Sequence, residues 1–270
     1  MKIGLTVHPS RPAPANFARQ LADRLVAAGH DLTGDAYTAQ TIGRDIGEAG
    51  AEIMLAIGGD GTVLEAARRA LARDIPVLGF NLGTIGFLAE VSTDELEHVV
   101  DAITAGRLTE RRRMTVSARI GEGRSMDGLN DIVVEKIHSQ RLVFLTVTID
   151  GEEFLTYRAD GVVTATPTGS TAYSFSAGGP LVDPAIRALL FTPVAAHSLF
   201  NRTVVLPEDS RISITVSSDR PVRVSVDGVE FGYLAEHDTV EITRGERDAR
   251  FLTIDDPPFP ATVKNKFRLT

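Results

Sequence analysis

The sequence has 270 residues, enough for one or two domains with a sizeable core. Its 43% hydrophobic and 24% charged residues are ordinary for a globular protein, and the net charge of −8 disfavours non-specific binding to nucleic acid. Cysteine is absent, which excludes disulfides, thiolate chemistry and zinc–sulfur sites. The N-terminal residues lack the layout of a signal peptide, and no apolar run reaches the ~20 residues that span a bilayer. We therefore expect a cytoplasmic protein with no membrane partner.

The first part of the chain alternates between predicted strands and helices. The apolar run from Ile53 to Ile57 is short and ends in two glycines, which predicts a buried central strand followed by a helix. The other predicted elements are strands over 2–7, 31–37 and 75–80, and helices over 15–28, from Thr41, and over 92–105, the last opened by a capping box from Ser92 to Glu95. Strands that alternate with helices predict a parallel sheet with crossover helices.

From residue 109 to 254 the pattern changes to short β-branched runs in which apolar and polar residues alternate. Asp150-Gly151 and Asp227-Gly228 are dipeptides typical of two-residue hairpin turns. We therefore expect an α/β N-terminal domain with a parallel sheet over 1–108, followed by a mainly antiparallel β-rich domain over 109–254. The tail over 255–270 carries apolar anchors and is expected to pack back on the first domain. The predicted strands of the β-rich half cover residues 115–120, 132–137, 143–149, 162–165, 212–216, 222–226 and 240–243.

The first chemical motif is Gly58-Gly59-Asp60-Gly61-Thr62, between the central strand and its helix. A glycine turn at this place directs backbone N–H groups and the positive end of the helix at a ligand, which favours a phosphate. The motif lacks the third glycine of G-x-G-x-x-G and the lysine of the P-loop. Asp60 is unusual in a phosphate-binding turn, and it fits if it binds a metal, accepts a proton or holds a sugar hydroxyl. The structural alternative is an aspartate that caps the helix.

The second motif is a loop rich in hydroxyl groups and glycine over residues 164–179. Such a composition lets the backbone approach a flat ligand closely, and Tyr173 is available for stacking. Pro167 and Pro180, together with the preceding apolar strand, argue against a flexible linker. The chain has no G-x-S-x-G elbow, so a serine hydrolase is not indicated. The six histidines have no metal-ligand spacing, and we expect no metal site built by the protein alone.

Four motifs in this chain, in the same order, resemble those of the NAD kinases. G-G-D-G-T alone is also similar to loops of lipid kinases and phosphofructokinases, whereas the stretch T-P-T-G-S-T-A-Y-S-F-S-A-G-G-P over 166–180 is far more specific to NAD kinases. The family fold, an α/β domain followed by a β-rich domain, agrees with the pattern of predicted elements. The four motifs are Gly58 to Thr62, Asn81-Leu82-Gly83 with Gly86-Phe87-Leu88, Asn130-Asp131, and Asp160-Gly161 through Pro180.

The resemblance implies a role for each matching residue. Asp60 matches the catalytic aspartate, which accepts the proton of the 2′-hydroxyl on the adenosine ribose. Asp131 stands where many members have Glu, so its reach to the ribose hydroxyls is one methylene shorter. The other implied contacts are Gly58, Gly59, Gly61 and Thr62 along the phosphates, Asn130 on the adenine, Thr168, Thr171 and Tyr173 in the adenine pocket, Asp160, Ala172 and Ser176 at the nicotinamide end, and Arg158 as the arginine of R-x-D-G.

The implied reaction transfers the terminal phosphoryl group of ATP to NAD and produces NADP. Mg²⁺ or another divalent cation is expected on the nucleotide phosphates, with Asp60 as either proton acceptor or metal organiser. The resemblance also implies a homodimer or homotetramer. Polyphosphate as donor, the choice between NAD and NADH, and feedback by NADPH stay open. Two alternatives remain: a diacylglycerol-kinase- or phosphofructokinase-like kinase with the same glycine turn, and a non-catalytic NAD-binding sensor.

Overall fold

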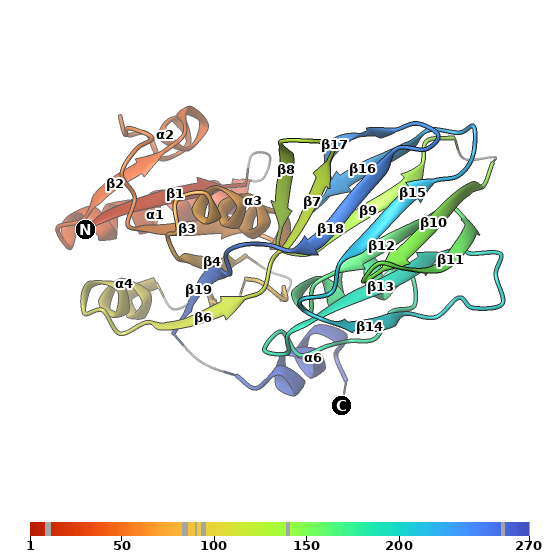
Figure 1. The fold of residues 1–270 in the computed structure, drawn as a ribbon. Helices are drawn as coiled ribbons and strands as arrows, with labels where there is room; N and C mark the ends of the chain where they lie inside the picture. The colour runs from red at the N-terminus through yellow and green to blue at the C-terminus, as the bar shows by residue number, and fades with distance from the viewer. Residues whose placement is uncertain are drawn as a thin grey trace. The chain divides into compact units, whose positions relative to one another are not determined.

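The computed structural model describes residues 1–8, 12–82, 86–89, 91–92, 96–138, 141–254 and 257–269. Its contacts divide the chain into two compact units (Figure 1). The first unit contains residues 1–112 and 249–270, and the second contains residues 113–248. None of the helices in the described part of the chain is long and apolar enough to cross a membrane.

The first unit is built on a mostly parallel sheet with the strand order β2-β1-β3-β4-β19-β6, and β5 pairs with β4. The pairs β1–β2, β1–β3, β3–β4, β4–β5 and β4–β19 are parallel, which confirms the predicted α/β architecture. The central strand β3 is buried along its whole length. The strands are β1 (Lys2–Val7), β2 (Asp31–Gly34), β3 (Ile53–Gly58), β4 (Val77–Asn81), β5 (Val91–Ser92), β6 (Thr109–Arg113) and β19 (Ala249–Thr253).

The helices of the first unit are α1 (Pro12–Ala27), α2 (Ala36–Ile42), α3 (Asp60–Leu71), α4 (Leu96–Thr104) and α6 (Phe259–Phe267). The four-residue spacing in α1 is confirmed, since Phe17, Leu21 and Leu25 are buried in one core cluster with the sheet. The predicted start of α1 at Ala15 is wrong. The helix begins at Pro12. Backbone N–H groups in the first turn of a helix have no partner within the helix, so a proline, which lacks this N–H, is tolerated there.

Two further predictions in this unit need correction. The predicted strand over 31–37 ends at Gly34, and the short helix ends at Ile42 instead of beginning at Thr41. The reason is Asp35, whose carboxylate accepts the N–H of Thr38 at 2.7 Å and so caps α2 at its start. The predicted capping box from Ser92 to Glu95 falls mostly outside the described residues.

The second unit consists of two antiparallel sheets that share one apolar core, as predicted for a β-rich domain. Their strand orders are β11-β10-β15-β18-β7-β8 and β14-β13-β12-β9-β16-β17. The strands are β7 (Val116–Ile120), β8 (Arg124–Gly128), β9 (Asp131–Lys136), β10 (Val143–Ile149), β11 (Glu152–Ala159), β12 (Gly161–Ala165), β13 (Ala188–Val194), β14 (Val204–Pro207), β15 (Ile212–Val216), β16 (Val222–Val226), β17 (Val229–Leu234) and β18 (Thr239–Arg244).

Both predicted hairpin turns are confirmed. Asp150-Gly151 joins β10 to β11, and Asp227-Gly228 joins β16 to β17. All four residues have positive φ, from 49° at Asp227 to 88° at Gly151, as a two-residue turn between twisted strands requires.

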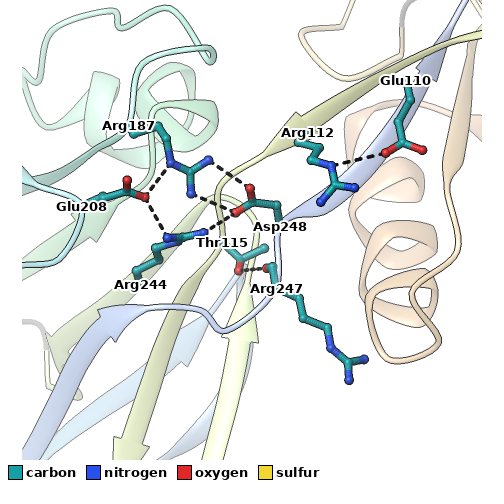
Figure 2. Close-up of polar contacts among 8 residues, drawn as sticks. All are labelled: Glu110, Arg112, Thr115, Arg187, Glu208, Arg244, Arg247 and Asp248. Carbon is teal, nitrogen blue, oxygen red and sulfur yellow. Dashed lines mark hydrogen bonds and ion pairs between the residues drawn. The ribbon is translucent and has the colours of Figure 1, made fainter.

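A network of four ion pairs links the end of the second unit, at Arg244 and Asp248, to Arg187 and Glu208 (Figure 2). Arg187 contacts Glu208 at 2.6 Å and Asp248 at 3.0 Å, while Arg244 contacts the same two carboxylates at 3.1 and 3.2 Å. Burial alone would raise the pKa of Asp248, but the hydrogen bond and charge of Arg187 outweigh burial and hold that pKa below its ordinary value. This group fixes the residues from which the chain continues into β19.

Candidate functional site

The glycine turn lies where β3 meets α3. Gly59 is the N-cap of α3 in an extended conformation, with φ −92° and ψ −174°, and no side chain caps the helix. The alternative in which Asp60 caps its own helix is therefore wrong. The N–H of Thr62 donates to the carbonyl of Gly59 at 2.9 Å. Since glycine has no side chain that could cap the helix, the N–H groups of Asp60 and Gly61 at its start are the ones available to an anion.

The carboxylate of Asp60 is held by a second loop that follows β4. The backbone N–H of Phe87 donates to Oδ2 at 3.0 Å, and the N–H of Leu88 donates to Oδ1 at 3.2 Å. Gly86 packs so closely that a Cβ atom on it would lie 1.9 Å from Oδ1. The orientation of this carboxylate is thus set by residues 26 to 28 positions further along the chain.

The glycines of the turn differ in what they contact. A Cβ atom on Gly58 would lie 2.2 Å from Oγ1 of Thr62, so Gly58 is required for the packing of the turn itself. A Cβ atom on Gly59 or Gly61 would meet nothing within 4 Å. These two glycines leave bare backbone open to a ligand, which is what close approach of a phosphate requires.

Two cavities adjoin this turn. The first has a volume of about 480 Å³ and is lined by Gly58, Gly59, Asp60, Gly86 and Lys266, among others. The second has a volume of about 540 Å³, and its lining includes Thr6, Tyr37, Gly59, Gly61, Thr62 and Arg69. Gly59 borders both cavities, so an extended ligand could run across the turn from one to the other.

The wall of the second cavity carries one arginine paired with two carboxylates. Arg69 on α3 contacts Asp35 at 2.9 Å and Glu65 at 2.9 Å. Burial alone would raise the pKa of Asp35, but hydrogen bonds from Thr38 and Arg69 outweigh burial and hold that pKa below its ordinary value. The paired carboxylates fix the guanidinium beside the glycine turn.

In the second unit, a polar cluster forms where three strands end. β9 begins at Asp131 and lies between β12 and β16, with Asp131 opposite Ala165. Asp227, in the turn after β16, accepts the N–H groups of Leu129, Asn130 and Asp131 at 2.7, 2.7 and 3.1 Å. One carboxylate therefore determines the backbone path of the Asn130-Asp131 motif.

The hydroxyl-rich loop packs on the same motif. The N–H of Thr166 donates to the carbonyl of Asn130 at 2.9 Å, and its hydroxyl donates to the carbonyl of Leu129 at 2.5 Å. A Cβ atom on Gly169 would lie 2.0 Å from the carbonyl oxygen of Asn130. Two motifs that are separate in the sequence are thus in backbone contact.

Asp131 is an unusual carboxyl group, because only 5% of it is exposed. Burial, and then the negative charge of Asp227, raise its pKa to about 7, although a hydrogen bond from the N–H of Tyr173 opposes this shift. Tyr173 is 37% exposed. Burial and the charges of Glu135, Asp160 and Asp131 raise the pKa of its hydroxyl. Tyr173 therefore lies within electrostatic reach of carboxylates at both ends of β9.

The remaining predicted site residues differ in their location and in how far they are exposed. Asp160 forms an ion pair with Lys136 at the far end of β9. Arg158 lies on the exposed face of β11 opposite Phe144, between the buried residues Tyr157 and Ala159. The others belong to the short 3₁₀ turn η2 (Thr168–Thr171), helix α5 (Tyr173–Ser176) and Ala172, which links the two. Thr168 is buried, Thr171 and Ala172 are half-buried, and Ser176 is exposed.

Three residues contribute to these clusters although the motifs alone do not assign them a role. Asp227 is identified from the sequence only as a turn residue, Gly86 only as part of a motif, and Lys136 not at all. The positive φ of Asp227 fits its turn, but its three bonds to residues 129–131 depend on the pairing of β9 with β16. Among the residues that the structure describes, no three His, Cys, Asp or Glu side chains form a group that could hold a metal ion.

The fold and the uncapped glycine turn are those of a two-domain nucleotide kinase. The family model of the ATP-NAD kinase N-terminal domain matches residues 3–108, and that of the C-terminal domain matches residues 129–254. This chain belongs to the NAD kinase family.

Relatives named NAD kinase support the same assignment. The chain is 39% identical to NAD kinase of Moorella thermoacetica over 222 residues, which cover 81% of this chain and 71% of the relative. It is 34% identical to NAD kinase of Heliobacterium modesticaldum over 277 residues, which cover 98% of each chain. These relatives lend no support to a lipid kinase, a sugar kinase or a sensor.

Two solved structures have the same fold. The crystal structure of yeast NADH kinase complexed with NADH matches with a TM-score of 0.89 at 26% identity, covering all of this chain and 88% of that one. The NAD kinase from Archaeoglobus fulgidus in complex with ATP matches with a TM-score of 0.76, covering all of this chain and 97% of that one. At 21% identity this second likeness concerns the fold alone.

Proposed function

We propose that this enzyme transfers the terminal phosphoryl group of ATP to the 2′-hydroxyl of the adenosine ribose of NAD and so produces NADP. The observation that carries the proposal is the setting of Asp60. Its carboxylate is held by two backbone N–H groups at the edge of an open cavity, next to glycines with bare backbone. Such a group can accept a proton beside a bound phosphate chain.

The first unit supplies the donor site. The phosphates of ATP lie along Gly58, Gly59, Gly61 and Thr62, at the uncapped start of α3. Support comes from the open space over Gly59 and Gly61 and from the cavities that adjoin the turn. Backbone N–H groups and the helix dipole then stabilise the negative charge without a dedicated lysine in the loop.

The second unit supplies the acceptor site. Asn130 holds the adenine of NAD and Asp131 holds the ribose hydroxyls, supported by the three hydrogen bonds with which Asp227 fixes this turn. The same proposed site includes residues of β11, the residue before β12, and residues of η2, α5 and the link between them. They are Thr168, Thr171 and Tyr173 around the adenine, Asp160, Ala172 and Ser176 toward the nicotinamide, and Arg158 from the R-x-D-G motif.

The chemical step depends mainly on positioning and charge neutralisation, because the transferred phosphoryl group needs little covalent help from the protein. Asp60 accepts the proton of the ribose 2′-hydroxyl as its oxygen attacks the terminal phosphorus in line with the leaving ADP. A positioned general base contributes about 10²- to 10⁴-fold to the rate of such a step. Each oxygen of Asp60 accepts one backbone hydrogen bond and retains lone pairs for the substrate proton.

The residues present fit a divalent cation that arrives with the nucleotide. The carboxylate of Asp60 lines the cavity beside the proposed phosphate path and could contact such a cation. Mg²⁺ carried by the ATP phosphates would neutralise part of their negative charge. If Asp60 instead organised this metal, Asp60→Asn would steepen the dependence of the rate on Mg²⁺ concentration.

The direct test is incubation of the purified chain with NAD, ATP and Mg²⁺, followed by detection of NADP with an NADP-specific dehydrogenase. NADP should form in proportion to enzyme and time, and reactions without ATP should form none. A parallel panel with NADH, diacylglycerol and fructose 6-phosphate as acceptors, and with polyphosphate as donor, defines the specificity. Phosphorylation of a lipid or sugar in place of NAD would overturn the proposal. The homodimer or homotetramer and the cytoplasmic location stay predictions.

A further inference from the structure

The C-terminal helix α6 reaches the cavity beside the glycine turn. It follows Pro258, spans nine residues and has no buried residue. Nevertheless its penultimate residue, Lys266, lines the same cavity as Asp60, Gly58 and Gly59. The tail of the chain therefore contributes a side chain to the candidate donor site, which the local sequence motifs do not indicate.

Phe87 is the residue on which the end of α6 packs. The rings of Phe87 and Phe267 have centroids 6.1 Å apart, and Nζ of Lys266 lies 5.5 Å from the centroid of the Phe87 ring. These distances are in the range of aromatic and cation–π contacts. The backbone N–H of the same Phe87 donates to Asp60. One residue thus positions both the ammonium of Lys266 and the carboxylate of Asp60.

The charged residues that line this cavity point to a role for Lys266 in binding phosphate. Among the described residues that line it, Lys266 is the one lysine or arginine, and Asp60 is the one carboxylate. A triphosphate brings several negative charges to a cavity that otherwise offers backbone N–H groups, His8 and the amide of Asn81. A flexible ammonium group is well suited to contact such phosphates as a mobile point charge.

We propose that Lys266 binds the phosphates of the phosphoryl donor, so that α6 forms part of the donor site. This inference rests on the proposed function. The cation–π contact with Phe87 holds the ammonium of Lys266 beside the cavity, and the ammonium contacts donor oxygens when the nucleotide binds. Since α6 buries no residue, its contacts at the cavity matter more for donor binding than for the stability of the fold.

The test compares Lys266→Ala with wild type and with Lys264→Ala, a control on an exposed position of the same helix. Lys266→Ala should raise the KM for ATP by about 10-fold or more, the usual effect of losing a hydrogen bond to a charged group. The KM for NAD and the melting temperature should not change. Lys264→Ala should behave as wild type, and Lys266→Arg should recover most of the affinity for ATP.

Two further measurements distinguish loss of the Lys266 charge from a structural effect of the Lys266→Ala substitution. Calorimetric binding of a non-hydrolysable ATP analogue without NAD should weaken by the same factor in Lys266→Ala. The KM for ATP of this variant should also depend less on salt concentration than that of wild type, because one screened contact is gone. An unchanged KM for ATP, or equal increases in the KM for ATP and NAD, would overturn the role of Lys266. Failure of the proposed function is a different result, because wild type itself would then form no NADP.

Discussion

Gly86 lies directly against the carboxylate of Asp60, so that a Cβ atom on Gly86 would approach Oδ1 to 1.9 Å. Glycine is required at this position because of the space that the Asp60 side chain occupies. The contact links the loop after β4 to the residue on which the proposed chemistry depends.

Gly86→Ala should therefore impair catalysis more than folding. The added methyl group displaces the carboxylate from the N–H groups of Phe87 and Leu88, and a small misplacement of a catalytic group can cost about 10²-fold in rate. We expect kcat to fall by roughly this factor, with little change in melting temperature. Gly47→Ala is the control, because a Cβ atom there meets nothing within 4 Å. Wild-type kcat in Gly86→Ala would contradict the positioning of Asp60 by this loop.

Gly61→Ala should separate stability from activity. Gly61 is the second residue of α3, and a Cβ atom there meets nothing within 4 Å. Alanine should stabilise the helix by about 0.5–1 kcal/mol in the free energy of unfolding. Its methyl group nevertheless occupies space proposed for donor phosphates, so the KM for ATP should rise. Urea unfolding and steady-state kinetics test the two effects, and an unchanged KM for ATP would exclude phosphate contact at Gly61.

Asp227→Ala should disturb both the fold and NAD binding. It removes the acceptor for three backbone N–H groups and puts alanine at a φ of 49°, so the free energy of unfolding should fall by about 3 kcal/mol. The KM for NAD should rise because the Asn130-Asp131 turn loses its support. Asp227→Asn, which tolerates this φ and keeps one acceptor oxygen, should lose less of both.

Asp150→Ala is the matched control for turn strain. Asp150 has a φ of 52° in the other two-residue hairpin and accepts the N–H of Arg211 at 2.8 Å. Its replacement should reduce the free energy of unfolding but leave the KM for NAD unchanged. An equal rise in KM for NAD in both variants would show that Asp227 acts through general stability.

Asp131 should give the stability of the protein a distinct pH dependence. Burial, with help from the charge of Asp227, raises its pKa to about 7 from the ordinary 3.8. Between these values the folded protein keeps the proton that the unfolded chain has lost. The free energy of unfolding therefore falls as pH rises across this window, by roughly 1.4 kcal/mol per pH unit at most.

Asp131→Asn lacks the titrating group and should escape this loss. Its stability relative to wild type should increase as pH rises from about 4 to about 7, and then stay constant. Urea unfolding at a series of pH values measures the difference. A difference that does not change with pH would show that the carboxyl of Asp131 titrates alike in the folded and unfolded protein.

Local patterns in the sequence were enough to predict the elements that carry the site. The apolar run before two glycines predicts β3 and α3, and the Asp-Gly dipeptides predict both hairpins, because these features depend on neighbouring residues alone. The start of α1 is harder to predict, because proline disfavours a helix interior but is acceptable in the first turn, where Pro12 and Pro14 lie.

Contacts between distant segments could not be predicted in the same way. Asp227 reaches N–H groups 96 to 98 residues earlier in the chain, and Asp60 reaches N–H groups 27 and 28 residues later. Which N–H groups these carboxylates meet depends on strand order and register, which no local pattern specifies. For the same reason Lys266, near the end of the chain, gives no sign in the sequence that it lines the cavity beside Gly59.

The role of Asp60 is tested most directly by Asp60→Asn, which keeps the size of the side chain and one acceptor for the N–H groups of Phe87 and Leu88. The measurement is the rate of NADP formation at saturating ATP and NAD, together with NAD binding by calorimetry. If Asp60 accepts the substrate proton, the rate of Asp60→Asn should be about 10²- to 10⁴-fold lower than that of wild type, while NAD binding is retained. A rate close to that of wild type would contradict the account.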